Sequence, residues 1–114
     1  MAIKKQTLNQ SIDQGTTFSK LIIVYLTDGT TVANLTNYTV SSQLRKNYTS
    51  TAYETINATI NTPTSGIIIM SLTAAQTAAL KPGRYVYDLE LTKADTTISR
   101  IIEGVITIRP EVTK

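Results

Sequence analysis

Polar and apolar residues alternate along several stretches of the chain, with turn residues between them. The alternation is clearest over residues 38–45, 54–60 and 84–92, where successive side chains of a strand point to opposite faces. A strand that is apolar on one side and polar on the other is typical of an antiparallel sheet with one solvated face. We therefore predict half-buried strands in these three segments.

Two further stretches, residues 21–26 and 66–70, are apolar without alternation. The run at residues 21–26 indicates a strand that is buried on both faces or makes a dense contact with the core, and the run at 66–70 indicates a further, strongly apolar strand. Asp28 and Gly29 follow the first run, and this pair favours a two-residue type I′ hairpin turn. Residues 3–8 and 11–13 are predicted to form one edge strand with a break, whose two halves pair with different sheets. The further predicted strands are residues 16–26, 30–33, 66–72 and 97–109.

One short helix is predicted, over residues 74–80. Thr73 and Gln76 have the spacing of a capping box, in which the threonine hydroxyl and the glutamine side chain satisfy backbone N–H groups at the start of the helix. The alanines that follow are good helix formers, and Pro82 with Gly83 ends the helix after about two turns. The helix therefore lies directly before the strand at residues 84–92.

About seven strands with turns between them indicate one all-β domain over residues 1–114. The order of the predicted strands and helix along the chain is best explained by an immunoglobulin-like antiparallel β-sandwich, with the short helix before the sixth strand. Tyr85 then occupies the place of a tyrosine corner, whose hydroxyl bonds to upstream backbone, and Tyr87 the place of a core cysteine in antibody domains. Two alternatives stay open: both tyrosines are ordinary core residues, or the fold is a jelly roll or small barrel.

The composition argues against catalysis, because the 114 residues include no histidine and no cysteine. The commonest general base and the commonest metal ligand are therefore missing, and neither a disulfide nor a thiolate metal site is possible. Asp88, Glu90 and Glu103 fall on strands expected to be neighbours, and three carboxylates can bind a hard cation. We expect instead a solvated face paired with Arg84 or Arg100. No enzyme activity, cofactor, metal site or small-molecule substrate is predicted.

The net charge is +3, from eleven cations and eight anions that are scattered along the chain. Without a basic run, we expect no binding to nucleic acid. No apolar stretch approaches the roughly 20 residues that span a bilayer, and residues 1–7 do not resemble a signal peptide. We therefore expect no membrane partner and a protein made in a cytoplasm.

The loop at residues 46–52 and its flanks combine arginine, lysine and tyrosine. Arg45, Lys46, Tyr48 and Tyr53 make a tip of the kind favoured at protein contacts. The alternative is that one tyrosine folds back and covers the end of the sandwich. These four residues are our first candidates for contact with a partner.

Several segments resemble structural proteins of tailed-phage virions, including the N-terminal module of the baseplate upper protein. The resemblance rests on LTAAQTAALKPGRYVYDLEL at residues 72–91 and RIIEGVITIRPEVT at 100–113, on QGTTF at 14–18, LTNY at 35–38 and SQLRK at 42–46. It spans nearly the whole chain. It implies an immunoglobulin-like module that attaches to other virion proteins, and it carries no catalytic residue.

The resemblance implies a structural protein of the virion, oligomeric within the particle and made in the cytoplasm of the bacterial host. We expect it to dock in the tail, baseplate or neck, through edge strands and loop tips. Ile3 and Lys5 in the N-terminal strand, which can add to a neighbour's sheet, and residues 111–114 join the contact candidates. The alternatives are a capsid decoration protein and a carbohydrate-binding module, the latter disfavoured because the chain has no tryptophan.

Overall fold

A computed structural model of the protein describes residues 3–112. The described chain consists of eight strands and one short helix, so the predicted all-β class is confirmed. The strands are β1 (Gln6–Thr7), β2 (Gln10–Asp13), β3 (Phe18–Ile23), β4 (Thr39–Arg45), β5 (Glu54–Thr62), β6 (Ile67–Leu72), β7 (Gly83–Thr92) and β8 (Ile98–Arg109). A 3-10 turn (Pro63–Ser65) precedes β6, and helix α1 (Ala74–Ala79) precedes β7.

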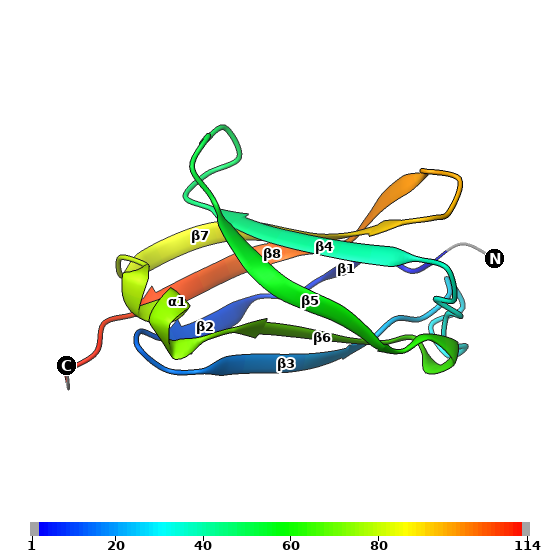
Figure 1. The fold of residues 1–114 in the computed structure, drawn as a ribbon, viewed down its shortest axis with the longest axis horizontal. Helices are drawn as coiled ribbons and strands as arrows, with labels where there is room; N and C mark the ends of the chain where they lie inside the picture. Colours follow the sequence, from blue (N-terminus) through cyan, green and yellow to red (C-terminus); the bar gives the residue numbers. More distant parts are fainter. Residues whose placement is uncertain (1–2, 113–114) are drawn as a thin grey trace.

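The strands form one mixed sheet in the order β1-β8-β7-β4-β5-β6-β3, with β2 also paired to β8. The sheet curls, so that β3 and β6 lie across from β7 and β8 (Figure 1). Alternate side chains from both sides fill the space between them. The buried residues include Ile22, Ile68 and Met70 from one side and Leu89, Ile102 and Ile106 from the other.

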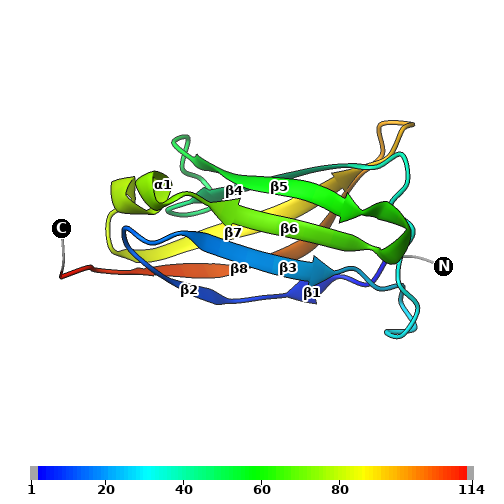
Figure 2. The same ribbon diagram turned by 60° about the horizontal axis from the view of Figure 1, so that its bottom comes forward.

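Strand β5 makes the bend between the two halves of the sheet. Its first residues pair with β4, whereas residues from Asn57 onward pair with β6. Figure 2 shows β5, β6 and β3 side by side in front, with β7 and β8 behind them. The sequence predicted a strand here, and the structure extends it to Thr62, directly before Pro63.

The N-terminal segment departs from the predicted antiparallel arrangement. Strands β1 and β2 both pair with β8, and both do so in parallel. The prediction that these two pieces pair with different sheets is therefore wrong. The N-terminal segment changes its pairing partner before β1 begins. Ile3 forms an isolated antiparallel bridge with Leu26, and the Lys4 N–H donates to the Tyr25 carbonyl at 2.8 Å.

The continuous apolar run at residues 21–26 is not buried on both faces. Strand β3 pairs only with β6 and lies at the end of the sheet. Ile22 and Val24 are buried, whereas Leu21 is 52% exposed and Ile23 is 36% exposed. An apolar run predicts burial only when both faces are covered, and the outer face of β3 is open.

The turn after this run is also different from the predicted two-residue hairpin. The N–H of Gly29 donates to the carbonyl of Leu26, and Gly29 has a positive φ of 75°. The Asp28 carboxylate accepts hydrogen bonds from the N–H groups of Thr30 and Thr31, each at 2.9 Å. A side-chain-capped turn therefore replaces the type I′ turn, and only an isolated bridge at Val32 remains of the strand predicted over 30–33.

Helix α1 follows the prediction closely. The Gln76 N–H donates to the Thr73 hydroxyl, and the Gln76 side chain accepts from the Thr73 N–H at 2.8 Å, which completes the capping box. Thr77 is fully buried, and its hydroxyl donates to the Thr16 carbonyl at 2.7 Å. The Gln14 side chain donates to the Leu80 carbonyl at 2.9 Å. These bonds fix the helix across one end of the curled sheet.

Candidate interaction site

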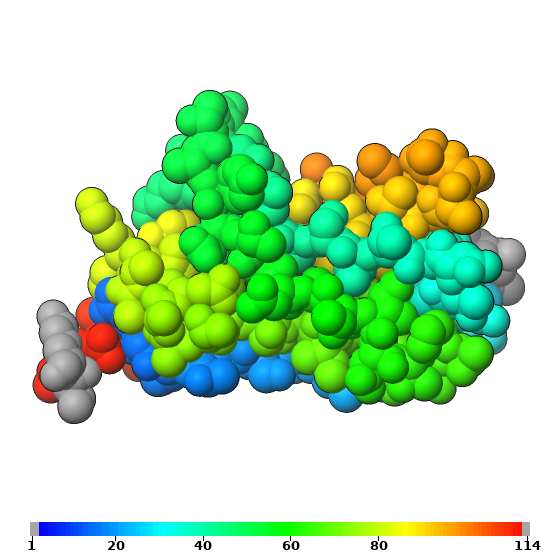
Figure 3. All heavy atoms as spheres, in the orientation of Figure 1, coloured from blue at the N-terminus to red at the C-terminus, as the bar shows by residue number. Residues whose placement is uncertain are grey.

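The loop between β4 and β5 projects from the body of the protein, as the ribbon and the space-filling view both show (Figures 1 and 3). Local hydrogen bonds shape it. The Asn47 side chain accepts from the Thr49 N–H at 3.1 Å and from the Thr49 hydroxyl at 2.8 Å. The Ser50 N–H donates to the Asn47 carbonyl at 3.1 Å. Asparagine forms such turns readily, because its short side chain reaches the backbone two residues onward.

Arg45 connects the base of this loop to its tip. Its guanidinium donates to the Ser50 carbonyl and to the Gln43 side chain, and lies 5.0 Å from the centre of the Tyr53 ring. A cation above an aromatic face is attracted to the ring, and the guanidinium plane suits such stacking. The structure therefore brings Arg45 and Tyr53 together and holds both ends of the loop.

The two loop tyrosines remain accessible. Tyr48 is 66% exposed and Tyr53 is 54% exposed. Tyr48 borders the outer face of β7 beside Val86, and Tyr53 lies near Leu80 and Tyr85 at the helix end of the sheet, so the alternative that one tyrosine covers this end stays open. Lys46, the fourth predicted contact residue, places its ammonium group 5.0 Å from the centre of the Tyr85 ring. The tip thus presents tyrosine to solvent while both cations lie against aromatic rings.

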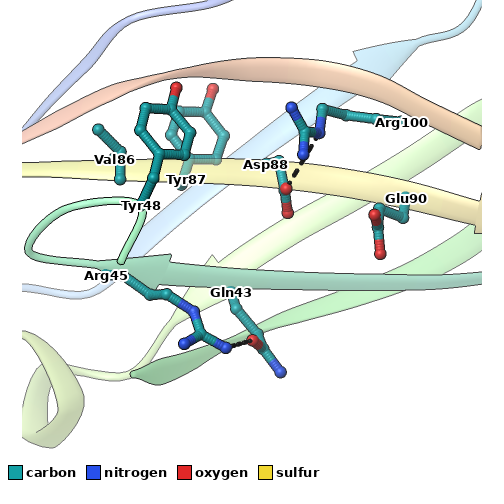
Figure 4. Close-up of a pocket in the computed structure, with 8 residues that line it drawn as sticks. All are labelled: Gln43, Arg45, Tyr48, Val86, Tyr87, Asp88, Glu90 and Arg100. Atoms are coloured by element: carbon teal, nitrogen blue, oxygen red, sulfur yellow. Dashed lines mark hydrogen bonds and ion pairs between the residues drawn. The ribbon is translucent and has the colours of Figure 1, made fainter. Parts of the chain in front are cut away.

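A shallow groove runs beside the loop over the outer face of β4, β7 and β8. Gln43, Tyr48, Asp88, Glu90 and Arg100 line it (Figure 4). Arg100 lies 3.2 Å from Asp88 and 3.3 Å from Glu103. Two of the three predicted carboxylates, Asp88 and Glu103, are therefore paired with Arg100, whereas no ion pair to Glu90 occurs among residues 3–112. No group of three potential metal-binding side chains occurs in the same described part of the chain.

The N-terminal contact candidates are held within the fold. Ile3 is partly buried, packs against the core and pairs with Leu26. Lys5 lies 3.9 Å from Glu103. The N-terminal strand therefore forms the last strand of its own sheet, and its addition to a neighbour's sheet stays a prediction. Of the candidate segment 111–114, residues 113 and 114 lie outside the described residues.

The two strand tyrosines have different roles. The Tyr85 hydroxyl donates to the Lys81 carbonyl, four residues upstream, at 2.7 Å. This is the type of bond that a tyrosine corner makes, although Tyr85 is only partly buried. Tyr87 is 2% exposed, and burial raises its pKa to about 12. Its hydroxyl donates to the Leu8 carbonyl.

Sequence reasoning missed a set of outward-facing aliphatic side chains on β3 and β6. Leu21 and Ile23 are exposed, and their partners Ile69 and Ile67 are half-buried; we call these four residues the aliphatic face. The sequence signal was present in the apolar run at residues 21–26, but it was interpreted as burial. Recognising β3 as the last strand of the sheet would have identified the exposed half of that run.

No protein-family model matches the chain, and no curated protein matches it. Among solved structures, the Listeria monocytogenes internalin-like protein lmo2027 is similar over 93% of this chain, with 19% identity and a TM-score of 0.49. The match covers 30% of the length of that protein's chain. A TM-score this low carries no argument about fold family or function. No described helix has the length and apolar character needed to cross a membrane.

Proposed function

We propose that this chain is a non-enzymatic structural protein of a tailed-phage virion, and that it docks onto other virion proteins in the tail, baseplate or neck. The observation that carries the docking role is the loop between β4 and β5. Arg45 is stacked on Tyr53 and hydrogen-bonded at the base of the loop, and both Tyr48 within the loop and Tyr53 at its end are exposed. Rigid tyrosines lose little conformational entropy on binding and are common at the energetic centres of interfaces. The virion assignment is supported by the sequence segments at residues 72–91 and 100–113.

The finer fold assignment belongs to the same proposal. We infer an immunoglobulin-like sandwich, with β8, β7 and β4 as one sheet and β5, β6 and β3 as the other. The antiparallel β4–β7–β8 pairing and the N-terminal strands parallel to β8 support it. The Tyr85–Lys81 hydrogen bond supports the corner. Modules of this kind present loops at the ends of a rigid sandwich, which suits attachment rather than catalysis.

The test is to locate the chain in particles produced by the phage that encodes it. Immunogold labelling with an antibody against the purified chain, together with its copy number per particle from quantitative mass spectrometry, gives position and stoichiometry. Label at the tail or its base, with a few dozen copies or fewer, supports the proposal. Hundreds of copies spread over the head would assign the chain to capsid decoration. Absence from purified particles would contradict the proposal.

A further inference from the structure

A hollow of about 220 Å³, which we call the end hollow, opens at the helix end of the sheet, between the base of the β4–β5 loop and the start of β7. Leu44, Leu80 and Tyr85 supply its apolar lining, and all three pack into the core. Figure 1 shows α1 and the start of β7 at this end, with the loop beside them. Sites for small molecules typically measure roughly 300–1,000 Å³, so the end hollow suits a single apolar side chain from a partner.

Cations border the end hollow. Arg45 and Lys46 line it, and Lys46 also lines the adjacent depression over the start of β7, together with Arg84. Among the described residues that line these two sites, Glu54 is the one acid. Its carboxylate already accepts a hydrogen bond from the Gln76 side chain at 3.0 Å. Three cations therefore face one carboxylate at this end of the protein.

None of these three cations has a carboxylate partner in the described part of the chain, because the ion pairs among residues 3–112 all use other cations. Lys46 lies over the Tyr85 ring and against Gly83, where an added Cβ atom would lie 2.9 Å from its Nζ. Arg45 donates to the Ser50 carbonyl, and a guanidinium with five N–H groups keeps donors for a further acceptor. Both cations are thus positioned in advance, so a carboxylate that binds them costs little side-chain entropy.

We propose that the end hollow binds an acidic segment of another virion protein, which inserts an apolar side chain and places a neighbouring carboxylate beside Lys46 and Arg84. This contact uses the docking loop, so it rests on the proposed function and adds the chemistry of the partner. Unpaired cations beside an apolar lining favour an acidic segment and disfavour a basic one. The net charge of +3 on each chain disfavours a second copy. The apolar lining also favours a peptide over a nucleic acid, whose phosphates have no apolar group to insert.

The partner chemistry is tested with the purified chain and three defined peptides. The first is Ser-Glu-Glu-Phe-Glu-Glu-Ser with both ends blocked, the second has lysine in place of every glutamate, and the third has alanine in place of phenylalanine. Each is titrated to about 10 mM, which covers weak affinities, and binding is followed by amide NMR shifts. We expect the first peptide to shift the amides of Leu44, Lys46 and Tyr85. It should bind about tenfold or more tightly than the other two, and less tightly at high salt.

Charge reversal locates the contact. The double variant Lys46→Glu with Arg84→Glu should weaken binding of the acidic peptide by about tenfold or more, since it replaces attraction by repulsion. The matched control is Lys20→Glu with Lys93→Glu, which makes the same change in net charge on β3 and in the β7–β8 loop and should leave binding unchanged. Circular dichroism melting confirms that both variants fold.

Several results would overturn the proposal: no binding of the acidic peptide, equal binding of the lysine or alanine peptide, or equal weakening in the control variant. A short thymidine oligonucleotide that shifts the same amides and binds more tightly than the acidic peptide would also overturn it, and would assign the site to nucleic acid. These outcomes are independent of whether the chain occurs in particles. Absence from particles would contradict the proposed function, whereas selective binding of the acidic peptide would still establish the docking site.

Discussion

The hydroxyl of Tyr87 donates a hydrogen bond to the main-chain carbonyl of Leu8, across 79 residues of sequence. Leu8 lies between β1 and β2, where the N-terminal strand is interrupted. On the other side of the break, the Asn9 side chain accepts from the Val105 N–H at 3.0 Å. The interruption of the strand is therefore a specified feature of the fold. The Leu8 carbonyl and the Val105 N–H, which the interruption affects, each have a side-chain hydrogen-bond partner.

Replacing Tyr87 with phenylalanine removes the donor and leaves the Leu8 carbonyl unpaired in a largely buried setting. We expect the free energy of unfolding to fall by about 1–3 kcal/mol, measured by urea denaturation. The matched control is Tyr85→Phe, which removes a more exposed hydrogen bond to Lys81 and should cost about 0.5–1 kcal/mol. An equal loss in the two variants would contradict the assignment of the larger role to Tyr87.

The same tyrosine predicts a loss of stability in alkali. Burial raises the pKa of Tyr87 from 10 to about 12, since the neutral phenol is favoured in the folded chain. The unfolded chain therefore loses this proton first, and the contribution of Tyr87 is complete below pH 10 and declines as the pH rises toward 12. Urea midpoints across this range should fall less steeply in Tyr87→Phe than in the wild type. An identical pH dependence of the urea midpoint in the two proteins would contradict the raised pKa of Tyr87.

Gly104 allows the backbone of Leu8 to approach β8. A Cβ atom at this position would lie 2.1 Å from the Leu8 carbonyl oxygen, which is main chain and cannot swing away. Gly104→Ala should therefore displace the N-terminal segment and lower stability by about 1–3 kcal/mol. Amide hydrogen exchange should show faster exchange in β1 and β2. Val105→Ala, next to it on the outer side, should leave that exchange unchanged.

Acid should destabilise the turn that follows Leu26 and contains Asp28. Hydrogen bonds from Thr31 and Thr30 lower the pKa of Asp28 to about 2. Because this pKa is lowered on folding, the ionised Asp28 carboxylate contributes to the stability of the folded chain above about pH 4, and this contribution is lost as the pH falls toward 2. The carboxyl titration of Asp28, followed by NMR, should have its midpoint near pH 2. A midpoint near the ordinary value of 3.8 would show that these bonds are not formed in solution.

Local signals in the sequence predicted local structure well. The capping box at Thr73 and Gln76 and the alternation along β4 and β7 all appear as expected. Each depends on residues within one element, so a short window contains the necessary information. The stacking of Arg45 on Tyr53 is also local, since it joins the two ends of one loop, but the sequence predicted these residues only as contacts for a partner.

Long-range relationships were predicted less well. The parallel pairing of β1 and β2 with β8 joins opposite ends of the chain, and no local pattern specifies it. The exposure of Leu21 depends on β3 being the last strand of the sheet, which the apolar run itself does not indicate. Asp28 and Gly29 predicted a turn correctly but not its type, because the threonines that follow compete for the aspartate side chain.

Docking through the loop between β4 and β5 is the central claim, and it is tested most directly by incorporation into particles. Wild-type chain and single variants are expressed in place of the phage's own copy, and the amount in purified virions is measured by quantitative mass spectrometry. We predict that Tyr48→Ala or Tyr53→Ala lowers incorporation by about tenfold or more, as expected for a tyrosine at the centre of an interface. Lys93→Ala, in the loop between β7 and β8, serves as the control and keeps wild-type incorporation. Full incorporation of both tyrosine variants would contradict the claim.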